Sequence, residues 1–160
     1  QSDGSYQSVI SIAGHRVICL DTLDPDPTPK HSGVLDKSRV EWLRQTLAEA
    51  TGHPTLVIMH HPPVALGLPF FDAIALRNGD EVFELLVNAK VDHVVTGHVH
   101  HFLQTSLGGL NLTTLKSTGF GLIAATDTPE IHPDVSDLPG YAVLTLGPEK
   151  PRVHLVEVCS

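Results

Sequence analysis

Apolar residues in this chain fall into short runs, each about the length of a β-strand. Residues 55–59 (TLVIM) are continuously apolar, which is typical of a strand buried on both faces of a sheet. A second short apolar strand begins at His93 and ends at Gly97. Three stretches have the patterns and turn residues of β-hairpins: 9–21, 102–115 and 140–158.

Two segments have helical spacing instead. Residues 37–50 place apolar positions on one face, and Ser38 and Glu41 have the spacing of a capping box. Residues 80–89 predict a second helix, with Asn78 as its N-cap. Stretches rich in proline, glycine and polar residues predict three loops: 23–33, 62–78 and 117–139.

The predicted order is hairpin, helix, strand, helix, strand and two further hairpins, with no internal repeat or linker. This order predicts one α/β domain with a mixed sheet. If strands 55–59 and 93–96 are parallel and helix 80–89 crosses between them, their carboxyl ends meet at one edge of the sheet. Ligands of α/β proteins bind at this edge.

The composition argues against several other classes of protein. The 160 residues carry a formal charge of −8, and the ten Lys and Arg residues are scattered, so we expect no nucleic-acid partner. The apolar runs are too short to span a bilayer, so we expect no membrane partner either. The two cysteines, Cys19 and Cys159, do not make a disulfide framework and favour a cytoplasmic location.

Histidine is the unusual residue in this sequence. Eleven are present, and seven of them fall between residues 53 and 101. The two buried strands end in HHPP at 60–63 and in GHVHH at 97–101. Because His98 and His100 are two residues apart, an extended backbone would point both rings to the same side. Neutral imidazoles favour Zn, Mn, Fe or Co over Ca or Mg, and the alternative is that these histidines have only structural roles.

Two motifs carry a resemblance to a known family. VIMHHPP at 57–63 and TGHVHH at 96–101 resemble the last two signatures of the calcineurin-like metallophosphoesterases. Within that family the sequence is most similar to the bacterial class III cyclic nucleotide and glycerophosphodiester phosphodiesterases, from about residue 9 onward. The resemblance implies an α/β fold that is the C-terminal half of a four-layer αββα sandwich with mixed sheets.

The resemblance also implies roles for individual residues. His60 and His98 would be ligands of one divalent metal ion (Mn, Fe, Zn or Co), and His100 a ligand of its neighbour in a two-metal site. His61 would lie near the substrate or behind the ligands, which makes it the catalytic candidate. The implied reaction is hydrolysis of a small phosphodiester, a 3′,5′-cyclic nucleotide or a glycerophosphodiester, by a metal-bound hydroxide.

The remaining histidines receive no such role. We expect exposed loop positions for His15, His31, His53, His93, His101 and His154. His132 lies in the predicted loop 117–139, from which it could reach the substrate side.

The family's earlier signatures are absent from this sequence. Members begin with Asp-x-His, then Gly-Asp, then Gly-Asn-His, and the one Gly-Asp here, at 79–80, comes after HHPP and suits a helix start. The carboxylate that bridges two metal ions is therefore missing. We expect residues 1–160 to be one partial domain that holds one metal ion or none and is inactive alone.

Two expectations follow from the missing half. The chain would expose a sheet edge and pair there with an N-terminal half or with another copy of itself. The alternative is a non-catalytic binding module of the same fold, which holds at most one metal ion through His60, His98 and His100.

Overall fold

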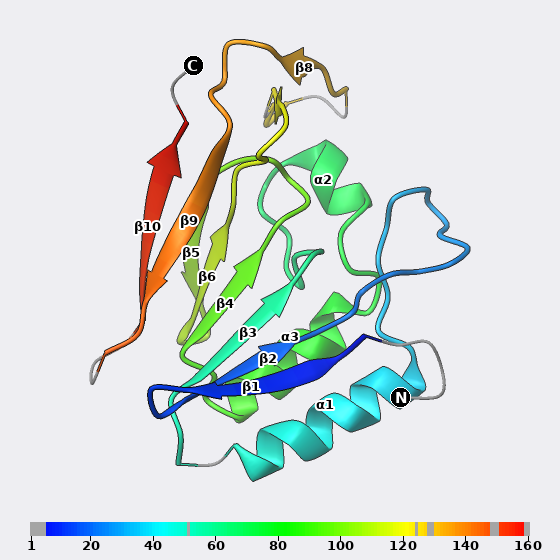
Figure 1. Ribbon diagram of the computed structural model, residues 1–160. Coiled ribbons are helices and arrows are strands. Elements are labelled where there is room, and N and C mark those ends of the chain that lie inside the picture. The colour runs from blue at the N-terminus through cyan, green and yellow to red at the C-terminus, as the bar shows by residue number, and fades with distance from the viewer. Residues whose placement is uncertain (1–5, 51, 124, 128–129, 148–150, 159–160) are drawn as a thin grey trace.

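The structure is a computed structural model that describes residues 6–50, 52–123, 125–127, 130–147 and 151–158. Within these residues, six strands form one sheet in the order β1-β2-β3-β4-β6-β5 (Figure 1). Their bounds are β1 Ser8–Ile12, β2 His15–Cys19, β3 Thr55–Met59, β4 His93–Thr96, β5 Leu103–Leu107 and β6 Leu110–Thr114. Strands β2, β3, β4 and β6 run parallel, whereas β1 and β5 are antiparallel to their neighbours. The predicted α/β class with a mixed sheet is confirmed.

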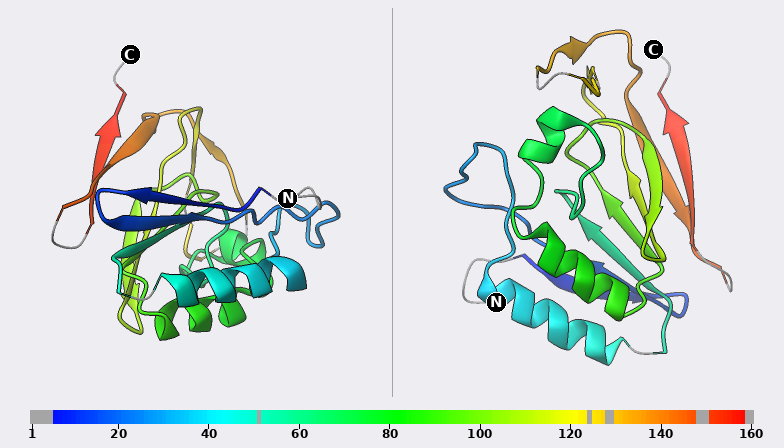
Figure 2. Two further views of the ribbon diagram at one scale, coloured as in Figure 1. Left: turned by 60° about the horizontal axis from the view of Figure 1, so that its bottom comes forward. Right: turned by 180° about the vertical axis from the view of Figure 1, so that it is seen from behind.

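Two helices, α1 (Lys37–Glu49) and α3 (Gly79–Asn88), cover one face of this sheet, as the left view of Figure 2 shows. Their apolar side chains pack with those of the strands into the main core. Its fully buried members include Ile18, Leu43, Val57, Val82, Leu86 and Val94. Burying each side chain of this size contributes about 1.5–3 kcal/mol. This core therefore holds the helices against the sheet.

Strands β3 and β4 lie side by side in parallel, and α3 lies in the connection between them. Met59 pairs with Thr96, so the next residues of both strands emerge at the same edge of the sheet. There the Gly97 N–H donates to the His60 carbonyl at 3.1 Å. The predicted meeting of the two strand ends is confirmed.

The start of α1 differs from the prediction. Asp36 is the N-cap, and its carboxylate accepts the backbone N–H of Arg39 at 2.9 Å. Ser38 donates its hydroxyl proton to the same carboxylate at 2.8 Å. The capping box of Ser38 and Glu41 was therefore wrong, because the residue just before the helix already supplies the capping oxygen.

Asn78 is the N-cap residue of α3, as predicted, but its side chain does not cap the helix. The side chain accepts the Leu35 N–H at 3.1 Å and donates to the Leu35 carbonyl at 2.8 Å. Asn78 thus ties the start of α3 to the segment that leads into α1.

The stretch 62–78 was predicted as a loop, but it contains the short helix α2 (Pro69–Ala73). Asp72 in this helix accepts three backbone N–H groups, from Leu66, Gly67 and Leu68, at 2.7, 3.0 and 3.1 Å. Proline in the first turn and an acidic residue close behind it are signals of a helix start.

The C-terminal hairpin of β9 (Gly140–Thr145) and β10 (Arg152–Glu157) is confirmed, and it forms a separate two-stranded sheet. The predicted loop 117–139 contains one more strand pair, β7 (Gly121–Leu122) and β8 (Pro133–Asp134). Lys116 links the segment between β8 and β9 to the end of β10. Its ammonium nitrogen lies 2.6 Å from carboxylate oxygens of both Asp137 and Glu157.

Strand β1 forms one edge of the six-stranded sheet, and no described strand pairs with its outer side. Ile10 and Ile12 on this strand are 51% and 52% exposed. The exposed sheet edge that we predicted is therefore present in the described part of the chain. Within that part, no helix combines the length and the apolar character needed to cross a bilayer.

Candidate metal centre

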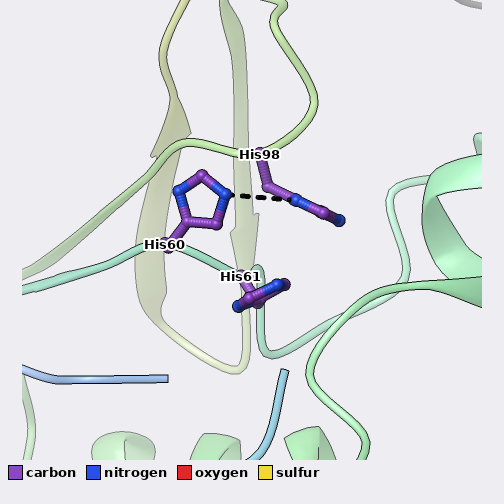
Figure 3. A group of neighbouring side chains, drawn as sticks. All are labelled: His60, His61 and His98. Atoms are coloured by element: carbon purple, nitrogen blue, oxygen red, sulfur yellow. Dashed lines mark hydrogen bonds between the residues drawn. The ribbon is translucent and has the colours of Figure 1, made fainter. Parts of the chain in front are cut away.

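His60 and His98 come from the adjacent ends of β3 and β4, and their rings approach each other at the sheet edge (Figure 3). The Nε2 atom of His60 lies 3.3 Å from the Nδ1 atom of His98. The glycine before His98 contributes to this approach: a Cβ atom on Gly97 would lie 3.3 Å from the Nδ1 atom of His60. A larger residue there would crowd the His60 ring.

The second ring nitrogen of His98 fixes which nitrogen carries the proton. Its Nε2 atom lies 3.1 Å from the Ile74 carbonyl oxygen. A carbonyl only accepts, so Nε2 of a neutral His98 carries the proton, and its Nδ1 accepts the Nε2–H of His60 at 3.3 Å in the metal-free chain. Histidine ligands of metal ions typically donate their other N–H to a carbonyl or carboxylate in this way.

The spacing of the two nitrogens suits a shared metal ion. Two imidazole nitrogens at about 2.0–2.1 Å from one tetrahedral metal ion lie about 3.3–3.4 Å apart. The observed separation of His60 Nε2 and His98 Nδ1 is 3.3 Å. His60 is exposed and His98 is half-buried, so further ligands can reach the pair from solvent.

His61 completes a group of three histidines whose ligand atoms all lie within 4.8 Å of one another. Both of its nitrogens are engaged, however. Nε2 donates to the His31 carbonyl at 3.0 Å, and Nδ1 accepts the Thr22 hydroxyl at 2.7 Å. In this arrangement His61 has no lone pair free for a metal ion.

Desolvation by the neighbouring protein atoms lowers the pKa of all three histidines, including His60, although His60 keeps an exposed surface. It is the largest cause for His98, whose pKa falls to about 3, with the neighbouring His61 and His60 adding to the effect. Burial also lowers the pKa of His61 to about 4, and it lowers the pKa of His60, with the charge of His100 as the second cause. The three rings are therefore neutral at neutral pH, the form that binds metal ions.

His100 lies outside this group. The extended backbone that we expected across 98–100 was wrong, since His98 and His100 have φ angles of +72° and +56°. The Nδ1 atom of His100 lies 2.9 Å from the Phe120 carbonyl oxygen, and its ring meets the Phe120 ring edge-on at a centroid distance of 4.8 Å. His100 remains close enough for its charge to lower the pKa values of His60 and His98.

The three histidines form part of the wall of a cavity of about 320 Å³. The rest of the wall comes from the segment after β2: Leu23, Asp24, Pro27, Lys30, His31 and Ser32. Asp24 is buried and bonded to the guanidinium of Arg77, which offsets its charge. The proline-rich stretch 23–33 gave no signal that it would face the histidines, because that contact depends on how the loop folds back.

The other histidines are placed as follows. His15 and His93 were expected in exposed loops, but they are 3% and 8% exposed, and His93 bonds Thr113 at 2.8 Å. His101 is half-buried, so its expected exposure was also wrong. His31, His53 and His154 are exposed, as expected, but His154 lies on strand β10 and not in a loop. His132 is exposed beside Glu130 and lies outside the wall of the cavity.

Comparison with known proteins identifies the family. The sequence model of the family described as "Calcineurin-like phosphoesterase" matches residues 3–102, a range that includes both histidine motifs. The chain belongs to the calcineurin-like phosphoesterase family. The resemblance carried by HHPP and GHVHH is thus confirmed.

The chain is similar to proteins named as phosphodiesterases. It is 38% identical over 158 residues to a probable cyclic nucleotide phosphodiesterase of Synechococcus, covering 96% of this chain and 56% of that protein. It is 34% identical over 87 residues to the glycerophosphodiester phosphodiesterase GpdQ of Enterobacter lignolyticus, covering 54% of this chain and 31% of that protein. The chain spans about half the length of the curated relatives that it matches over almost its whole length.

A solved structure confirms the fold. The crystal structure of a dimetal phosphatase from Danio rerio matches 96% of this chain and 58% of its own, with a TM-score of 0.69 and 15% sequence identity. At this identity the match concerns the fold alone. The architecture is therefore that of the metallophosphoesterases.

Proposed function

We propose that this chain forms part of a metal-dependent phosphodiesterase site, as a single partial phosphoesterase domain over residues 1–160. His60 and His98 would hold one divalent ion, Mn, Fe, Zn or Co. His100 would bind a second ion in the complete enzyme, and His61 would stand behind the ligands. A cytoplasmic location is part of the proposal, supported by the low cysteine count of two.

The observation that carries the proposal is the pair of facing nitrogens, His60 Nε2 and His98 Nδ1, at 3.3 Å. The Ile74 carbonyl holds the proton of His98 on the opposite nitrogen, so the inner nitrogen keeps its lone pair. A metal ion would bind there when the proton that His60 Nε2 donates to it moves to His60 Nδ1. When bound, two divalent ions would polarise a phosphoryl group and lower the pKa of an attacking water.

The described group of three histidines contains no carboxylate. Two divalent ions held close together need anionic ligands to offset their charge, and Asp24 in the cavity wall is engaged by Arg77. The anionic ligands would therefore come from another segment, an N-terminal half of the domain or a second copy of the chain. Strand β1 has no described strand partner on its outer side, and the Ile10 and Ile12 side chains leave apolar surface exposed on its face; both features support such pairing.

The proposed substrates are small phosphodiesters of the 3′,5′-cyclic nucleotide or glycerophosphodiester class. The names of the relatives from Synechococcus and Enterobacter support these two classes. The cavity of about 320 Å³ beside the histidines is near the lower end of the size range of small-molecule sites.

The second candidate function is a non-catalytic module that holds at most one metal ion through His60, His98 and His100. The absence of a carboxylate from the described histidine group favours this candidate. Tight binding of one metal ion, without hydrolysis even when a polypeptide with the family's acidic motifs is added, would support the module.

Equilibrium dialysis against Mn²⁺ tests the metal pair. We expect residues 1–160 to bind about one ion and His98→Ala to lose most of this binding, since one of two facing ligands is gone. His154→Ala is the matched control, because His154 is an exposed histidine on β10. Equal binding by wild type and His98→Ala would contradict the proposal.

Hydrolysis of bis(4-nitrophenyl) phosphate with added Mn²⁺ tests the reaction. We expect no turnover by residues 1–160 alone, because the carboxylates are missing from the site. A longer polypeptide that adds the acidic motifs should hydrolyse the ester and lose nearly all activity on His98→Ala. Turnover by the longer form that survives His98→Ala would rule out the proposed role of this histidine.

A further inference from the structure

The ring of His61 lies between the proposed ligand pair and the loop that follows β2. Its centroid is 4.8 Å from that of His60, with the planes at 86°, and 4.4 Å from that of His98, with the planes at 52°. Only 7% of His61 is exposed. The orientation of this ring therefore limits where the rings of His60 and His98 can lie.

Two residues of the preceding loop fix the ring of His61 from the other side. The Thr22 side chain, which is 2% exposed, bonds Nδ1 at 2.7 Å. Gly33 lies close against the ring, since a Cβ atom there would be 2.3 Å from Nδ1 and 2.5 Å from Cγ. No residue larger than glycine fits at position 33 unless His61 moves.

One short segment holds both sides of this arrangement. The Gly33 N–H donates to the Ala75 carbonyl at 3.3 Å, and the Gly33 carbonyl accepts the Arg77 N–H at 2.9 Å. The adjacent Ile74 carbonyl accepts the Nε2 proton of His98. Residues 74–77 thus bond both Gly33, which packs against His61, and the proposed ligand His98.

We infer that Thr22 and Gly33 are positioning residues of the metal site and act through His61. The inference rests on the proposed metal pair and adds residues that lie outside both histidine motifs. The Thr22 hydroxyl bonds the ring of His61, and the missing side chain of Gly33 leaves the space that this ring occupies. In this position His61 keeps His60 and His98 at the spacing that one metal ion requires. Outer partners of this kind typically change metal affinity by about 10–100-fold when they are removed.

A titration of residues 1–160 with Co²⁺, followed by the visible absorption of the bound ion, tests this inference. Thr22→Val keeps the shape of the side chain but lacks the hydroxyl, so we expect the affinity for Co²⁺ to fall about tenfold. Thr22→Ser restores a hydroxyl and should return the affinity to within about threefold of wild type. Gly33→Ala should weaken binding at least as much as Thr22→Val and change the spectrum at saturation.

Thr113→Val is the matched control. Thr113 is also fully buried and also bonds a histidine at 2.8 Å, but that histidine, His93, begins β4 and is not one of the three grouped histidines. Its melting temperature should fall like that of Thr22→Val, while its affinity for Co²⁺ stays at the wild-type value. The melting curves also show whether each variant is folded.

The outcomes separate this inference from the proposed function. Wild-type affinity in Thr22→Val and Gly33→Ala, with binding that His98→Ala abolishes, would overturn the positioning roles alone. Equal losses of affinity in Thr22→Val and Thr113→Val would also overturn them, because loss of stability would then explain both. Equal Co²⁺ binding by wild type and His98→Ala would overturn the metal pair and this inference with it.

Discussion

The Nδ1 atom of His98 lies 3.3 Å from the Nε2 atom of His60, although 38 positions separate the two residues in the sequence. Parallel pairing of β3 and β4 brings them together, and the Ile74 carbonyl sets the proton of His98 on the outer nitrogen. In the metal-free chain these two nitrogens share a hydrogen bond, with the proton on His60 Nε2. Once that proton moves to His60 Nδ1, both nitrogens would direct lone pairs at one divalent ion.

The stability of the metal-free chain should fall as the pH drops below about 6.5. In the unfolded chain His61 and His98 bind protons near pH 6.5, whereas burial holds their folded pKa values at about 4 and about 3. The unfolded state thus binds more protons between these limits, and the free energy of unfolding decreases there by at most about 1.4 kcal/mol per pH unit for each histidine. Above pH 6.5 these two residues add no pH dependence. Urea unfolding with a chelator at pH 7.5, 6.5 and 5.5 measures the slope.

His61→Gln should make this slope shallower, and His154→Gln should leave it unchanged, because His154 is exposed. A slope that is the same in wild type and His61→Gln would show that His61 titrates normally in the folded chain.

Gly97→Ala should weaken metal binding with little change in stability. The added Cβ atom would lie 3.3 Å from the Nδ1 atom of His60, so the ring must shift by a few tenths of an ångström. We expect the affinity for Co²⁺ to fall about three- to tenfold, because metal sites depend on sub-ångström placement of their ligands. Gly147→Ala is the control, since nothing lies within 4 Å of that position. Unchanged affinity in Gly97→Ala would mean that His60 does not bind the ion.

Asp36→Ala should lower the free energy of unfolding by about 1 kcal/mol, as the loss of an N-cap typically does. The Asp36 carboxylate caps α1 through the Arg39 N–H, and this bond is the largest cause of its lowered pKa. Asp36→Asn keeps an oxygen that accepts from the backbone and should retain most of the stability. Thermal or urea unfolding compares the three proteins, and equal losses in both variants would contradict the capping role.

Much of the fold could be predicted from the sequence because the signals were local. The continuous apolar run 55–59, the run that begins at His93 and the helical spacing between them fix two parallel strands and their crossover. That order alone places HHPP and GHVHH at the same edge. The family resemblance rests on these same two motifs and is shown by the match to residues 3–102.

The arrangement within the site could not be predicted in the same way. The positive φ angles of His98 and His100 send their rings to different partners, and a two-residue spacing in sequence carries no sign of such a turn. The partner of His61 is Thr22, which lies 39 positions away in a proline-rich region without regular spacing. Contacts of this kind depend on the path of a loop through space.

Metal titration of the histidine rings tests the central claim most directly. Long-range ¹H–¹⁵N spectra of the labelled chain, recorded as Zn²⁺ is added, report on each ring nitrogen separately. We predict that His98 Nδ1 and His60 Nε2 take the shifts of metal-bound nitrogens, while His61 keeps its proton on Nε2 and both of its nitrogens stay unbound. Metal-bound shifts on His61, or no change at His60 and His98 when Zn²⁺ is in excess, would contradict the account.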